Sequence, residues 1–167
     1  MQEKPKVFVT RTRHDFAAKE FSFTQADVPA ASSDLASFRA LAWEAFKKFS
    51  LPVTTDEAWR RTDLRLLPAS DFKLPKEDAF EDLPVIPEEL LKPLTGEQHG
   101  GQITLLPGGS QIQLDASLAR QGLVFTDFRT AQKEHADLLA KLIGQIVKPD
   151  DGKFAALASA LAQNGVL

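Results

Sequence analysis

Cysteine is absent from this chain of 167 residues. Its absence excludes disulfide bonds, thiolate nucleophiles and the sulfur ligands of zinc and iron–sulfur sites within the chain. No stretch approaches the roughly 20 apolar residues that span a bilayer. The first residues also lack the apolar segment of a secretory signal. We therefore expect a cytoplasmic protein with no membrane partner.

An excess of positive charge is also missing. Twenty lysines and arginines face 23 acidic residues, which gives a net charge of −3 and a pI of about 5.6. Such a chain has no general attraction to phosphate backbones, so we expect no nucleic-acid partner. Hydrophobic residues make up 43% of the chain and charged residues 26%, as in ordinary globular proteins.

Histidine-based metal motifs are missing as well. The three histidines, His14, His99 and His135, lie far apart in the sequence. Glu134 and Asp137 flank His135, but adjacent helical residues point about 100° apart and do not converge on one ion. A solvated charged face explains this group better than a metal site does.

Two further features favour structure over chemistry. The glycine pairs at 100–101 and 108–109 lack the following helix and lysine of a phosphate loop. Asp127 could be a catalytic carboxylate, but an aspartate before a helix is more often a cap. We therefore predict no catalytic residue, no metal ligand and no bound cofactor, with a small enzyme of unrecognised site as the least favoured alternative.

The first third of the chain predicts an arm followed by a helical hairpin. Residues 1–31 carry mixed charge and scattered phenylalanines, which indicates an arm whose aromatic side chains pack on the body or contact a partner. Apolar residues at helical spacing from Leu35 to Phe49 predict one helix. Thr54 and Glu57 have capping-box spacing, which predicts a second helix ending near Asp63 and completes a hairpin over 32–66.

A cluster of basic residues follows that second helix start. It is the one candidate partner-binding patch, made of Trp59, Arg60, Arg61 and Arg65. Arginines beside a tryptophan can bind an anion or stack on a ring. Asp56, Glu57 and Asp63 would neutralise them, so packing of Trp59 as an anchor of the hairpin is the favoured interpretation.

The remaining sequence divides into a linker and a small α+β region. Residues 67–101 are rich in proline and acidic residues, which predicts an extended linker with one helical turn near 87–91. Residues 102–105 and 111–114 alternate polar and apolar around a Pro-Gly-Gly-Ser turn, which predicts an antiparallel hairpin. We expect a third strand at 122–126, helices at 130–142 and 153–162, and a new strand from Gly165.

Several segments resemble one known family. Residues 51–64 resemble the "LP…DEEWRYTxL" segment of SufD-type proteins, residues 122–127 resemble "GVIFTDL", and residues 153–157 resemble "KFAAL". Their order and spacing agree over roughly residues 35–167. The chain thus resembles the N-terminal portion of the SufB/SufD family of iron–sulfur cluster assembly scaffolds, and the W-R-x-T-D-L segment favours SufD.

The resemblance carries expectations about fold and function. It implies an α+β region, 102–167, that leads into a truncated β-helix core, and SufB-like and SufC-like subunits as partners of the full-length protein. It supplies no site residues, because no position here matches the family's functional residues. Truncation would leave an unpaired edge near Gly165, so a homodimer of this piece is one hypothesis. An independent protein-binding adaptor is the alternative function.

Overall fold

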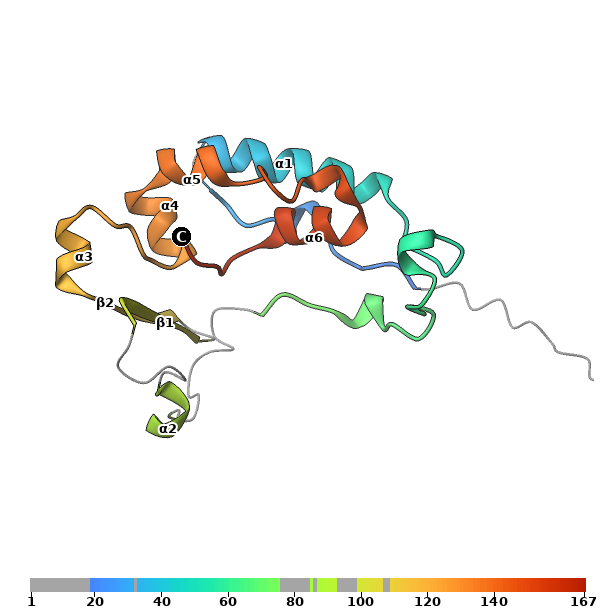
Figure 1. The fold of residues 1–167 in the computed structure, drawn as a ribbon. Coiled ribbons are helices and arrows are strands. Elements are labelled where there is room, and N and C mark those ends of the chain that lie inside the picture. Colours follow the sequence, from blue (N-terminus) through green and yellow to red (C-terminus); the bar gives the residue numbers. More distant parts are fainter. Residues whose placement is uncertain (1–18, 32, 76–84, 86, 93–98, 107–108) are drawn as a thin grey trace, which may run out of the picture.

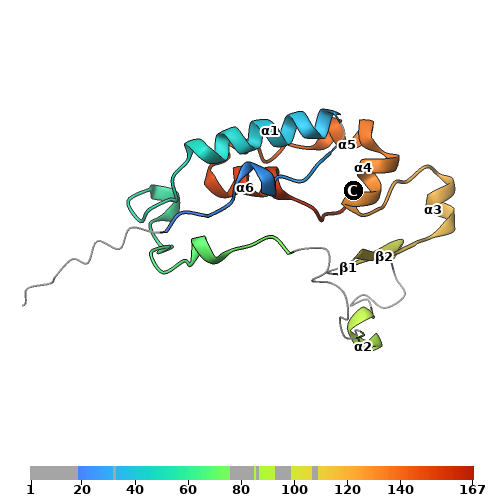
Figure 2. The ribbon, with the colours of Figure 1, turned by 180° about the vertical axis from the view of Figure 1, so that it is seen from behind.

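The computed structural model describes residues 19–31, 33–75, 85, 87–92, 99–106 and 109–167. In this part of the chain the fold is mixed, with helices and a two-stranded antiparallel sheet. Helices α1 (Ser33–Lys48) and α6 (Lys153–Leu161) lie side by side, and the sheet lies apart from them (Figures 1 and 2). The α+β class is thereby confirmed.

The main hydrophobic core lies between α1 and α6. Ala42, Trp43 and Phe46 of α1 meet Ala156 and Ala160 of α6, and all five are buried. The two alanines are fully buried, and their small side chains let the helix axes approach closely. Both helices begin and end close to where the apolar spacing placed them.

A second core cluster lies where α4 (Phe128–Glu134) and α5 (Ala136–Leu142) meet the start of α1. The prediction of one helix over 130–142 is wrong, because His135 has φ −133° and ψ 35° and separates the two. The bend lets Ala131 of α4 and Leu139 of α5 both pack against Leu35. One straight helix could not follow that cluster.

The hairpin prediction is confirmed. Strand β1 (Gly101–Leu106) pairs antiparallel with β2 (Gly109–Leu114), with Ile103 opposite Ile112. A short helix, α3 (Ala116–Arg120), follows and is capped by the Asp115 carboxylate. The turn residues 107–108 lie outside the described residues.

The third strand expected at 122–126 is not formed as a member of this sheet. Thr126 instead exchanges two backbone hydrogen bonds of 2.9 Å with Leu167, and Asp127 forms an isolated antiparallel bridge with Val166. The apolar run 122–126 contributes packing rather than a ladder, since Phe125 closes over Gly101. Residues from Gly165 onward do pair as a strand would, and the truncated β-helix and the homodimer stay predictions.

The second helix expected near 54–63 is wrong. The segment holds only a 3-10 turn, Glu57–Trp59, in which Trp59 N–H donates to Asp56 C=O at 2.9 Å. The expected capping box is replaced by the Asp56 carboxylate, which accepts from Val53 N–H at 3.0 Å. Bonds between residues three apart give a tight, irregular connection, so the helical hairpin over 32–66 is not formed.

Shorter elements complete the described chain. Helix α2 (Glu88–Leu91) is the helical turn predicted within the linker. Three more 3-10 turns occur, at Gln25–Asp27, Ala69–Asp71 and Pro149–Asp151.

Residues 19–31 run along the α1–α6 pair. Phe21 and Phe23 stack with ring centroids 5.8 Å apart and pack against the main core, as the sequence predicted for the arm. Phe8 and Phe16 lie outside the described residues. The guanidinium of Arg39, on α1, donates to the carbonyls of Pro29 and Ala30 and fastens this segment.

Candidate functional site

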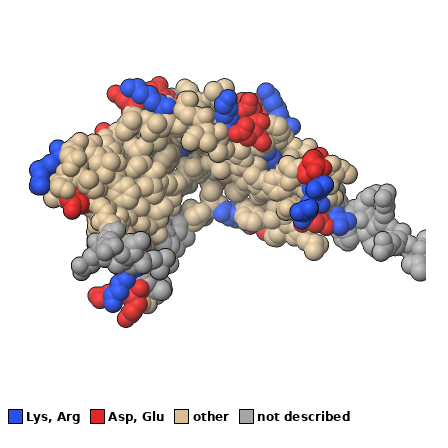
Figure 3. Space-filling view, in the orientation of Figure 1, with Lys and Arg blue, Asp and Glu red and all other residues tan. Residues whose placement is uncertain are grey.

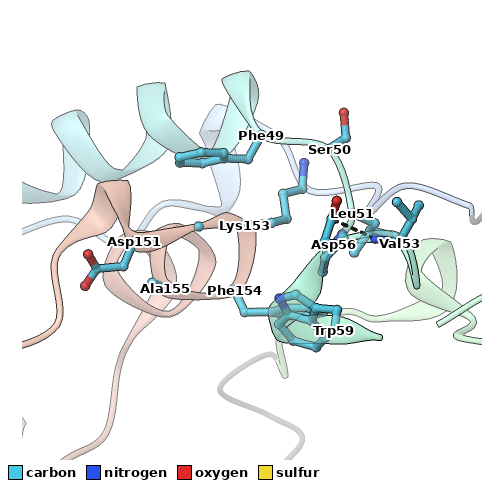
Figure 4. A pocket seen from close by; sticks show the side chains of 12 residues that line it. Phe49, Ser50, Leu51, Val53, Asp56, Trp59, Asp151, Lys153, Phe154 and Ala155 are labelled. Atoms are coloured by element: carbon cyan, nitrogen blue, oxygen red, sulfur yellow. Dashed lines mark hydrogen bonds between the residues drawn. The ribbon is translucent and has the colours of Figure 1, made fainter. Parts of the chain in front are cut away.

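A cleft of about 640 Å³ opens at the end of the α1–α6 pair. One wall is the chain leaving α1, residues 49–59, and the other is the start of α6 (Figure 4). The wall is mainly apolar and aromatic, with Leu51, Val53, Trp59 and Phe154 among its members. This cleft is the candidate functional site.

Lys153 is built into the wall of the cleft. Its side chain is 7% exposed, and its ammonium lies 4.0 Å from the centre of the Phe46 ring. The Nζ donates to Phe46 C=O at 3.1 Å and pairs with a Glu20 carboxylate oxygen at 3.1 Å. The other Glu20 oxygen accepts from Leu51 N–H at 3.1 Å. These contacts neutralise the lysine and tie three segments together, so it is not a free cation for a ligand.

The aromatic side of the cleft is formed by Trp59 and Phe154. Their ring centroids lie 5.3 Å apart at an interplanar angle of 32°. Trp59 is partly exposed, and Figure 4 shows its ring beside that of Phe154. A partly exposed indole presents apolar area and a ring face to any ligand in the cleft.

Two carboxylates belong to residues of the cleft wall. Asp56 is exposed, and its carboxylate accepts from Val53 N–H within the cleft (Figure 4). Asp151 caps the Pro149–Asp151 turn by accepting from Lys148 N–H at 2.8 Å. In Figure 4 the Asp151 carboxylate points away from Trp59, so Asp56 is the acid that faces a ligand.

The predicted patch of arginines does not converge on this cleft. Arg60 pairs with Glu57 at 3.2 Å, and its side chain is 56% exposed. The Arg65 Nε donates to both Asp63 carboxylate oxygens at 2.9 Å. The expected neutralisation by Glu57 and Asp63 is therefore confirmed.

Electrostatics agree with this pairing. Hydrogen bonds from the Arg65 side chain and backbone lower the pKa of Asp63 to about 2, and the same contact raises the pKa of Arg65. Arg61 is exposed. The surface in Figure 3 shows basic and acidic side chains side by side over α1, and the hollow below α1 is lined mostly by uncharged side chains.

A family comparison fits this architecture. The model of the SufBD protein N-terminal region matches residues 18–167. The chain belongs to this family. The family is one of iron–sulfur cluster assembly in the SUF system, so the recognition of a SufB/SufD-type N-terminal region is confirmed. No solved structure matches the chain.

In this SufB/SufD-family chain the other polar candidates have structural roles. The Asp127 carboxylate caps α4 by accepting from Thr130 N–H at 2.9 Å, and it accepts from the Ser110 hydroxyl at 2.8 Å. The backbone N–H of Thr130 is the main cause that lowers the pKa of Asp127. The sequence-based interpretation of Asp127 as a cap is confirmed, and the residue links β2 to α4.

Metal and membrane signals were sought in the described part of the chain. There, no three histidine or acidic side chains come together as metal ligands. No helix among the same residues has the length and apolar character needed to cross a bilayer. His14 lies outside the described residues, and His135 occupies the bend between α4 and α5.

Sequence reasoning found one residue of the cleft and missed the others. Trp59 was a candidate, but Lys153, Glu20 and Phe154 were not. Glu20 and Lys153 are separated by more than 130 residues, so no local pattern could have joined them. The Lys-Phe pair at 153–154 was visible only as part of the family motif.

Proposed function

We propose that this chain is the non-catalytic N-terminal region of a SufD-like scaffold in iron–sulfur cluster assembly. It acts through protein–protein contacts with SufB-like and SufC-like subunits. The family match over residues 18–167 carries this proposal, because it spans all the packed elements described above. The assignment to SufD rather than SufB rests on the W-R-x-T-D-L segment at residues 59–64.

The non-catalytic role is supported by how the polar groups of the chain are used. Asp127 caps a helix, Lys153 closes a junction of three segments, and Arg39 binds three backbone carbonyls. Each buried or half-buried polar side chain thus has a structural task. The apolar cleft beside Trp59 offers a surface for a protein contact rather than a set of converging catalytic groups.

Co-purification tests the proposed partners. The chain would be produced together with the SufB-like and SufC-like subunits of its own organism, and the complex measured by size-exclusion chromatography with light scattering. We expect the chain to elute at the mass of a complex. Elution of the chain at its own mass, while the other two subunits associate with each other, would overturn the proposal.

A further inference from the structure

The cleft beside Trp59 has the size and lining of a ligand site. Its volume of about 640 Å³ lies within the roughly 300–1,000 Å³ of common ligand pockets. Leu51, Val53 and Phe154 supply apolar area, and Trp59 supplies a partly exposed ring. An apolar side chain placed here would be shielded from water.

Charge in the cleft favours a positively charged ligand. Its single lining cation, Lys153, is 7% exposed and already bound to Glu20, Phe46 C=O and the Phe46 ring. The exposed carboxylate of Asp56 has one hydrogen bond, to Val53 N–H, and carboxylates accept several. A phosphate or another anion would meet this carboxylate without a free cation to balance it.

Trp59 adds a second reason to expect a cation. An ammonium or guanidinium over an indole face is attracted by the ring quadrupole, and tryptophan is the best such partner. The nearby Arg60 and Arg65 do not fill that role, because they are held by Glu57 and Asp63. The ring face and the Asp56 carboxylate therefore act together on one positive group.

We propose that the Trp59–Asp56 cleft binds a partner-protein segment in which a lysine or arginine lies next to an apolar side chain. The apolar side chain occupies the wall of Leu51, Val53 and Phe154. The basic group lies between the Trp59 ring and the Asp56 carboxylate. This inference rests on the proposed function, because it names the chemistry of the protein contact that the function requires.

Nuclear magnetic resonance on the full chain can test this directly. The chain has two tryptophans, and Trp43 is 4% exposed, so its indole N–H signal is an internal control for that of Trp59. The probe is the acetylated peptide Gly-Lys-Val-Phe-Val-Arg-Gly, and its control carries Glu in place of Lys and Arg. We expect a saturable shift of the Trp59 signal with the basic peptide and none with the acidic one.

Variants localise the contact. Asp56→Asn keeps an oxygen for Val53 N–H but removes the charge, and we expect it to weaken binding of the basic peptide about two- to fivefold. Glu134→Gln removes one exposed charge on α4, away from the cleft, and should leave binding unchanged. Equal binding of both peptides, no saturable shift, or unchanged binding by Asp56→Asn would each overturn the inference.

The two proposals fail separately. A chain that co-elutes with the SufB-like and SufC-like subunits but does not bind the basic peptide overturns this inference alone. A chain that binds the basic peptide at Trp59 but does not co-elute with the subunits overturns the proposed function alone.

Discussion

At the scale of single residues, Arg39 is the most buried charged group among the described residues, with 2% of its surface exposed. Its guanidinium donates to the carbonyls of Pro29, Ala30 and Ala162 at 2.9, 3.1 and 2.6 Å. Burial lowers the pKa of Arg39. Three carbonyls from two distant segments thus take the place of a carboxylate partner.

Replacing this guanidinium should unfold the chain more easily. We expect Arg39→Met to lower the free energy of unfolding by about 2–3 kcal/mol, because three buried carbonyls lose their donor. Urea denaturation followed by circular dichroism measures it, with Arg39→Lys as the intermediate variant. If Arg39→Met were as stable as the wild type, the cost of burying the charge would equal the gain from its hydrogen bonds.

Asp127 is the second residue whose removal should be felt. Asp127→Ala takes the cap from α4 and the bond from Ser110, and we expect a loss of about 1–2 kcal/mol. Asp115→Ala removes the cap of α3, an exposed helix of five residues, and should cost less. Equal losses in urea denaturation would show that the bond from β2 to Asp127 contributes nothing.

The same carboxylate predicts a dependence of stability on pH. Its pKa in the folded chain lies below the ordinary value of 3.8. Its contribution is therefore present above that value and lost as the pH falls below it, through the lower pKa of the folded state. We expect the difference in stability between the wild type and Asp127→Asn to shrink between pH 5 and pH 2, and a constant difference would contradict this cause.

At the scale of elements, the end of α5 depends on Gly144. It has φ +72°, and a Cβ there would lie 2.5 Å from Cε2 of Phe38 on α1. Gly122 has a similar φ of +82°, but nothing lies within 4 Å of its Cβ position. The two glycines separate backbone strain from a steric clash.

Alanine substitution at these positions gives a matched pair. Gly122→Ala should cost about 1 kcal/mol, because a left-handed conformation is strained for alanine. Gly144→Ala has the same strain and must also displace Phe38 from the second core cluster, so we expect a clearly larger loss of thermal stability. Equal melting temperatures for the two variants would contradict the packing of α5 against α1.

Close packing of α1 and α6 gives another element-scale prediction. Ala160 is fully buried between the helices, and Ala158 on the same helix is exposed. Ala160→Leu should therefore destabilise the chain by about 1–3 kcal/mol through overpacking. Ala158→Leu, with the same helix propensity change, should stay near the wild type in urea denaturation.

Elements with a strong period could be predicted from the sequence. Helix α1 shows apolar residues from Leu35 to Phe46 at helical spacing, and β1 and β2 alternate around a glycine-rich turn. Segments that depend on tertiary contacts could not. The bend at His135 follows from two helices packing on Leu35, and residues 54–63 lack enough local signal to resist the contact of Trp59 with Phe154.

The candidate site was predictable only in part, for the same reason. Trp59 could be singled out because a tryptophan beside arginines is unusual. The cleft around it needs Phe154 and Lys153, which lie nearly 100 residues later in the chain. Apolar spacing predicts which face of a helix is buried, but it does not predict which distant segment covers it.

At the scale of the whole molecule, the described chain has two ends with different tasks. The α4–α5 end joins the hairpin through Asp127, and the other end carries the cleft at the start of α6. A SufB/SufD-family N-terminal region built in this way presents surfaces and a cleft for other proteins. The central claim is that it works within the cluster assembly machinery through such contacts.

Immunoprecipitation from the source cells, with an antibody raised against this chain and quantitative mass spectrometry of the captured proteins, tests that claim most directly. The account predicts that SufB-like and SufC-like subunits are enriched well above a control precipitation with non-specific antibody. Recovery of the chain without either subunit would contradict the account and would favour an independent adaptor.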